Sequence, residues 1–196
     1  MRVPLTSILN ALEMMQLGLD GPLSQEAQTS LGHIADDMTR LRSAAESLLR
    51  LVRITEYTAR PRPTDLVSLL GKLPPQPPRT LHIAPDKPLP AVRADSELLF
   101  EVLSLAVQYV ASVAEAGAIP VSADQQEEKV VIQVGAWPAA PGPLPDAAIR
   151  DEQAIWLLTC RRGAQKLGAD FEVAGDAQGA FAVRFSLKEE SAAEKA

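Results

Sequence analysis

One stretch decides the fold: residues 27–52 read AQTSLGHIADDMTRLRSAAESLLRLV. Apolar or small residues recur there every three or four positions, at Ala27, Leu31, Ile34, Met38, Leu41, Ala45, Leu48 and Val52. That spacing is typical of a helix that packs along one seam. The opposite side is charged, at Asp36, Asp37, Arg40, Arg42, Glu46, Arg50 and Arg53. The stretch therefore predicts a long amphipathic helix.

A shorter helix is predicted before it, because the same spacing of three and four occurs at Leu5, Ile8, Leu12, Met15 and Leu19. Pro4 suits the first turn of a helix, where its missing N–H costs little. Residues 18–22, GLDGP, indicate a turn, and Ser24 is the expected N-cap of the long helix. The start of the chain is therefore predicted to be a helical hairpin.

A hairpin with one apolar seam on each helix cannot bury both seams well alone. Two hairpins paired as a four-helix bundle can, so we expect a homodimer. The predicted dimer interface is Leu5, Ile8, Leu12, Met15, Leu31, Ile34, Met38, Leu41 and Leu48. The alternative is an intramolecular core, with the hairpin packed on the rest of the chain.

The domain organisation follows from changes in composition. We expect a hairpin over residues 1–58, a linker over 59–65, an α+β domain over 66–187 and a disordered, charged tail over 188–196. Arg60-Pro61-Arg62-Pro63 indicates a stiff, solvated linker. The run Pro74-Pro75-Gln76-Pro77-Pro78 is expected to be an extended connector, with a ligand for a proline-binding module as the alternative.

Beyond the linker, helices and strands interleave. Helices are expected over 65–73, capped by Thr64 or Asp65, and over 96–114 and 151–167. Strands are expected over 80–84, 118–123, 129–134, 171–174 and 180–187. This order predicts an α+β sandwich, with one sheet and helices on one of its faces.

Composition excludes several classes of function. The formal net charge of −6 provides no broad basic field, so no nucleic-acid partner is expected. Apolar runs look too short for a membrane span, and no signal peptide is recognisable. The single cysteine, Cys160, lies in an apolar helical run and is expected to be a buried thiol in a reducing cytoplasm.

Residues 1–8, MRVPLTSI, resemble the back half of the phosphoacceptor box of sensor histidine kinases, which commonly reads HEMRTPLTSI. Residues 21–24, GPLS, are similar to a common hairpin turn of that family, and residues 48–54, LLRLVRI, to the usual end of its hairpin. The resemblance implies that the phosphoacceptor His and its acid would stand immediately before Met1. The chain is then expected to begin just downstream of a catalytic centre, through either a cut or a real loss.

The second half resembles the ATP-binding domain of the same family by order of elements, through residues 89–103 and 129–134. Active members hold Mg²⁺ through asparagines at positions that correspond here to Leu105 and Tyr109, and Asn10 is the only asparagine in the chain. The adenine-binding D-x-G-x-G is replaced by residues 136–140, AWPAA, and no G-x-G occurs. Glu152 stands near the start of the helix that would meet phosphate. We therefore expect no ATP, no metal, no other cofactor and no catalytic residue, whether the domain is a degenerate relative or an unrelated α+β domain.

Neither histidine is expected to accept phosphate. His33 lies off the apolar seam, His82 alternates with Leu81 and Ile83, and neither has an acid beside it. Val3 also replaces the Thr or Asn that the family uses to position water, which argues against phosphatase activity.

These observations favour a dimeric, cytoplasmic two-component signalling protein. It would carry phosphate between receiver domains if a His-Glu pair precedes Met1, and otherwise act as a regulatory scaffold for a response regulator or a partner kinase. The alternatives are an adaptor or anti-sigma-like binding module and a fragment of an ordinary sensor kinase. The resemblance implies that a receiver domain would dock on the hairpin, at Ala11, Met14, Met15, Ala44, Ser47 and Leu51.

Overall fold

The amphipathic residues 27–52 form one continuous helix, as predicted, in a computed structural model of the chain. The structure describes residues 2–17, 21, 23–76, 79–84, 89–113, 117–138, 142, 151–175 and 181–189. Contacts divide the chain into two compact units, Met1–Leu49 and Arg50–Ala196.

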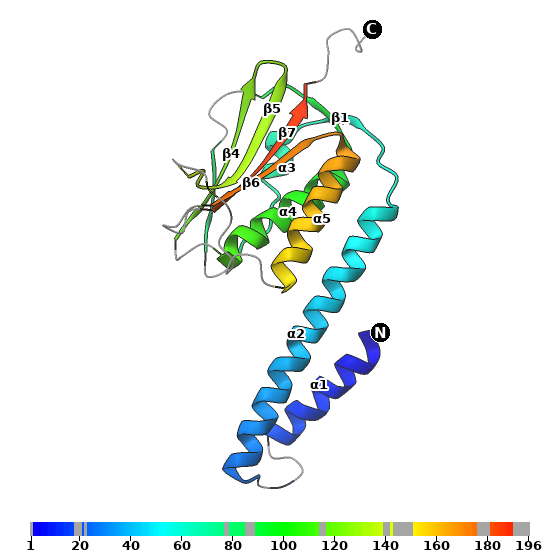
Figure 1. Cartoon of the computed structure of the whole chain (residues 1–196), viewed down its shortest axis with the longest axis vertical. Coiled ribbons are helices and arrows are strands. Elements are labelled where there is room, and N and C mark those ends of the chain that lie inside the picture. The colour runs from blue at the N-terminus through cyan, green and yellow to red at the C-terminus, as the bar shows by residue number, and fades with distance from the viewer. Residues whose placement is uncertain are drawn as a thin grey trace. The chain divides into compact units, whose positions relative to one another are not determined.

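The first unit is a helical hairpin made of α1 (Arg2–Gln16) and most of α2 (Gln25–Glu56) (Figure 1). Ser24 caps α2 as predicted, because its hydroxyl oxygen accepts a hydrogen bond of 3.2 Å from the N–H of Ala27. Most of the predicted turn, residues 18–20 and 22, lies outside the described residues, and Leu19 of the predicted seam lies there too.

The second unit has the predicted α+β class. Its main sheet has the strand order β2-β4-β5-β7-β6, with β2 parallel to β4 and the other pairs antiparallel. The strands are β2 (Leu81–Ala84), β4 (Ile119–Gln126), β5 (Lys129–Gly135), β6 (Asp170–Gly175) and β7 (Phe181–Lys188). Helices α4 (Ser96–Val113) and α5 (Asp151–Leu167) lie side by side against one face of this sheet (Figure 1). Each of these elements falls within a few residues of its predicted range.

The core lies between the sheet and these two helices. Alternate residues of β5 and β7 point into it, including Ile132, Val134, Val183 and Phe185, each with 0% of its surface exposed. The helices approach closely at Gly163 of α5, where an added Cβ would lie 2.2 Å from a methyl carbon of Val102. A glycine is needed there because no side chain fits between the two helices.

Helix α4 also has the length and composition of a membrane-spanning segment, contrary to the expectation from the sequence. Among the described helices it alone meets that test, with a mean hydropathy of 1.3 over Ser96–Val113. Half of that stretch is buried inside the domain, and the core helix of a soluble domain passes the same test.

The predicted linker, residues 59–65, is partly a strand. β1 (Arg62–Thr64) pairs antiparallel with β3 (Val92–Ala94), which sequence analysis had not predicted. Thr64 is 6% exposed, and its hydroxyl donates a hydrogen bond of 3.0 Å to the Ala94 carbonyl. Proline is compatible with such an edge strand because Pro63 needs no N–H on its solvent side. Composition indicated a linker, but pairing with a distant segment decided the structure.

The boundary between the units also lies earlier than the predicted 58/59. Ile54 is 1% exposed and belongs to the core of the second unit, so the last turns of α2 are part of the domain.

Asp65 caps the short α3 (Leu66–Leu70), accepting from the N–H groups of Val67 and Ser68, as one of the two predicted caps. The predicted tail starts one residue too early, since Lys188 ends β7, while residues 190–196 lie outside the described residues.

Candidate functional site

The apolar seam of the hairpin is largely open within a single chain. Leu12 is buried at 8% exposure, and Leu31 and Met38 are half-buried. The other described seam residues are exposed: Ile8 46%, Met15 40%, Ile34 48%, Leu41 55% and Leu48 51%. The side chain of Leu5 lies outside the described part of the structure. An exposed apolar stripe of this length is typical of an interaction surface.

The predicted receiver-docking residues form two sets. On α1, Ala11, Met14 and Met15 are all exposed, and Met14 has 50% of its surface accessible. On α2, Ala44 and Leu51 are half-buried. Ser47 is buried at 8% exposure and its side chain is therefore hardly accessible. The methionines of α1 are the accessible apolar part of this predicted surface.

Both histidines lie where the sequence predicted. His33 is exposed on α2. His82 is exposed on β2, between the half-buried Leu81 and Ile83.

The two residues expected from the sequence resemblance to stand in place of magnesium-binding asparagines are part of the hydrophobic core. Leu105 and Tyr109, one turn apart on α4, are 1% and 0% exposed. Burial raises the pKa of Tyr109 to about 12. A leucine side chain offers no ligand to a cation, and a neutral phenol is a poor one beside the oxygens that Mg²⁺ requires. These residues do not fit a magnesium–nucleotide complex.

The segment expected from the sequence to stand in place of the adenine-binding motif contacts Arg184 of β7. Gly135 ends β5 with φ +93°. Two residues later, the ring of Trp137 packs on the guanidinium of Arg184, and the Cζ of Arg184 lies 3.6 Å from the centroid of that ring. Arg184 points away from α4 and α5, because its neighbours Val183 and Phe185 face the core. Its guanidinium also donates to Gln133, at 3.1 Å. Residues 139–141 and 143–150 and the Glu152 side chain lie outside the described part of the structure.

Asp95 is a structural site that sequence reasoning missed. It is 6% exposed and accepts hydrogen bonds from the N–H of Leu98 (3.1 Å), the N–H of Arg60 (2.8 Å) and the hydroxyl of Tyr57 (3.2 Å). Burial alone would raise the pKa of this carboxyl, but these hydrogen bonds and one from the N–H of Glu97 more than offset it, so its pKa is lowered. An Asp directly before a helix is a recognisable N-cap signal, but its bonds to Tyr57 and Arg60 come only from the fold.

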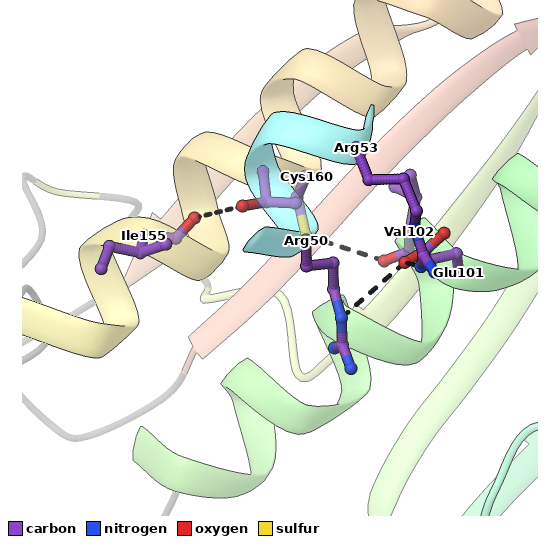
Figure 2. A network of polar contacts seen from close by, with 7 residues as sticks. Arg50, Arg53, Glu101, Val102, Ile155 and Cys160 are labelled. Carbon is purple, nitrogen blue, oxygen red and sulfur yellow. Dashed lines mark hydrogen bonds and ion pairs between the residues drawn. The ribbon is translucent and has the colours of Figure 1, made fainter. Parts of the chain in front are cut away.

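Ion pairs join the end of α2 to α4. Arg50 and Arg53 both point to the carboxylate of Glu101, and the Nε of Arg50 lies 3.7 Å from it (Figure 2).

Nearby, the Cys160 thiol donates to the Val102 carbonyl at 3.6 Å (Figure 2). Cys160 is fully buried, as predicted, and burial raises the pKa of its thiol. In the described part of the chain, no group of three or more His, Cys, Asp or Glu side chains is placed to hold a metal ion.

No protein-family model matches the chain, and no curated protein sequence matches it. Solved structures do match. The chain is 20% identical to full-length ShkA in complex with AMPPNP, with a TM-score of 0.64 over 97% of this chain and 44% of that one. It is 12% identical to the histidine kinase AdeS of Acinetobacter baumannii, with a TM-score of 0.60 over 95% of this chain and 96% of that one. It is 14% identical to the histidine kinase ThkA in complex with the response regulator protein TrrA, with a TM-score of 0.59 over 97% of this chain and 61% of that one.

These matches show the fold: the hairpin and the α+β domain together have the architecture of a sensor histidine kinase core. The chain spans less than half the length of the ShkA chain that it matches.

Proposed function

We propose that this chain is a cytoplasmic two-component signalling protein: a homodimeric histidine-kinase-like core that does not bind ATP and that presents its hairpin to a receiver domain. The observation that carries the proposal is the open apolar seam of the hairpin, on a chain with the fold of a histidine kinase core. Pairing two hairpins along this seam buries it in a four-helix bundle.

Loss of ATP binding is supported by the chemistry of the domain. The two positions that would hold magnesium are Leu105 and Tyr109, and both side chains are packed in the core. In the segment that would bind adenine, the ring of Trp137 packs on the guanidinium of Arg184, whose side chain points away from the helices. A phosphotransfer role requires a His-Glu pair upstream of Met1, because His33 and His82 have no acid beside them, whereas a scaffold role requires none.

The first prediction is that magnesium–ATP does not stabilise the protein. With about 5 mM nucleotide, a dissociation constant of about 1 mM would stabilise the fold by about 1 kcal/mol and raise the melting temperature by roughly 2–4 °C. We expect no rise in a thermal melt and no saturable heat in calorimetry. Magnesium alone is the control. A dissociation constant below about 1 mM contradicts the proposal.

Receiver binding is assigned to α1 because its methionines are accessible. Met14 and Met15 are flexible and polarizable, and suit a contact that forms and breaks. A receiver domain is the partner because ThkA, which this chain resembles in fold, is described in complex with a response regulator.

The second prediction concerns Met14→Glu in the full chain. A charge within the proposed docking surface is expected to weaken receiver binding by about tenfold or more. Titrating labelled receiver domains from the same genome measures this. The full chain is used because a cut at 58/59 would take Ile54 and Tyr57 from the domain.

The matched control is Leu158→Glu, which alters an apolar residue on α5 of similar exposure, 44% against 50% for Met14. We expect this variant to bind receivers normally. If Leu158→Glu abolishes binding and Met14→Glu does not, the chain is an adaptor that uses its ATPase-like domain as the binding surface.

A further inference from the structure

A surface cavity lies at the start of α4, in the second unit. Its volume is about 470 Å³, within the usual range for small-molecule sites. The lining comes from β1, from α3 and the residues after it, and from the first turns of α4, and it includes Arg62, Leu69, Lys72, Ser96, Glu97 and Phe100. A more polar hollow of about 600 Å³ shares Arg62, Ser96 and Glu97 with it and adds Arg60 and Asp95.

The lining combines an apolar part with hydrogen-bonding groups. Pro63, Leu69 and Phe100 supply the apolar part, and Leu69 is 6% exposed. Ser68 and Ser96 add hydroxyl groups. Such a lining suits a ligand with an apolar body and a few polar groups.

The charges that remain available are mainly positive. Two of the nearby carboxylates already accept hydrogen bonds within the fold: Asp65 accepts from two N–H groups of α3, and Asp95 accepts from three N–H groups and a hydroxyl. Glu97 is the acid that remains. Among the described residues, the side chains of Arg60, Arg62 and Lys72 take part in no ion pair.

We propose that this cavity binds a small soluble organic anion, with its apolar body against Leu69 and Phe100 and its acidic group held by Arg62 and Lys72. Unpaired cations next to an apolar surface recognise a carboxylate, phosphate or sulfonate through charge-assisted hydrogen bonds. Glu97 opposes the bound anion and lowers its affinity.

The test uses naphthalene-1-sulfonate as the anion and 1-naphthalenemethanol as its neutral counterpart, titrated into the full chain by calorimetry. We expect saturable binding of the sulfonate and binding of the alcohol that is about tenfold weaker or more. The double variant Arg62→Gln/Lys72→Gln should weaken sulfonate binding by about tenfold or more. Glu97→Gln should tighten it by about twofold to fivefold, because a repulsive charge is removed.

The matched control is Arg161→Gln/Lys166→Gln, which removes two exposed cations of α5 that do not line the cavity. Both double variants change the formal net charge from −6 to −8, so a nonspecific effect of charge would be the same in each. We expect the control to bind the sulfonate like the wild type. The proposal is overturned by equal binding of the two probes, by equal losses in the two double variants, or by absence of saturable sulfonate binding. Circular dichroism verifies that each variant is folded.

Discussion

The Gly135→Ala variant is expected to lose roughly 3–4 kcal/mol of folding free energy, which lowers the melting temperature of the domain by on the order of 10 °C. Gly135 has φ +93°, a conformation that a residue with a Cβ adopts only under strain. A Cβ there would also lie 2.1 Å from the carbonyl oxygen of Phe181. That oxygen belongs to the backbone of β7, the partner strand, so it cannot move aside as a flexible side chain would. Thermal and urea denaturation measure the loss.

Gly168→Ala separates the two causes. Gly168 also has a positive φ, +67°, but an added Cβ would meet nothing within 4 Å. This variant should lose only about 1–2 kcal/mol, the cost of the left-handed conformation. Equal losses in the two variants would show that the contact with β7 contributes nothing and that strain alone acts at Gly135.

The second large effect is expected for Leu41→Glu. Leu41 is 55% exposed in the single chain and lies in the middle of the predicted interface of α2. In the proposed dimer two unpaired carboxylates, one from each copy, would be buried, at a combined cost of about 3–5 kcal/mol. The dimer dissociation constant should then rise by roughly a hundredfold to several thousandfold. Light scattering across a range of concentrations measures it.

The matched control is Thr39→Glu. Thr39 is an exposed residue of the same helix, two positions away and off the apolar seam, so the same charge there stays in water. We expect the control to give twice the chain mass at micromolar concentration, as the wild type should. A monomeric wild type would contradict the dimer, and a dimeric Leu41→Glu would show that this seam is not the interface.

The longest and most regular patterns in the sequence predicted the fold well. The seam from Ala27 to Val52 lies entirely within α2, and the predicted helix over 151–167 has the same bounds as α5. These elements are predictable because their periodicity extends over many residues and each turn repeats the same signal. Ser24 and Asp65 were recognisable as caps because capping depends on residues only three positions away.

Shorter elements were missed where their partners lie far along the chain. β1 and β3 have three residues each, and neither has a periodicity that could be recognised. Their pairing joins Arg62 to Ala94, across about thirty residues of intervening sequence. The prolines beside β1 favoured a linker, but a strand at a sheet edge tolerates them.

The same contrast between local and long-range information applies to the candidate sites. The resemblance predicted that Leu105 and Tyr109 stand in place of magnesium ligands, and the structure adds that both are core residues. The cavity beside Arg62 and Lys72 could not be predicted from the sequence, because the residues that line this cavity come from three separate parts of the fold. The bonds of Asp95 to Tyr57 and Arg60 could not be predicted from the sequence either.

The sequence by itself determined the amphipathic hairpin and the α+β class of the second half, because both depend on local periodicity. Tertiary structure alone decided where the units divide, at Leu49–Arg50, since only the packed core shows that Ile54 belongs to the domain. It also decided the surroundings of the charged side chains: Glu101 forms ion pairs with Arg50 and Arg53, whereas Arg62 and Lys72 line a cavity. The physical reason is that burial and ion pairing depend on residues far apart in the chain, and a local pattern carries no information about them.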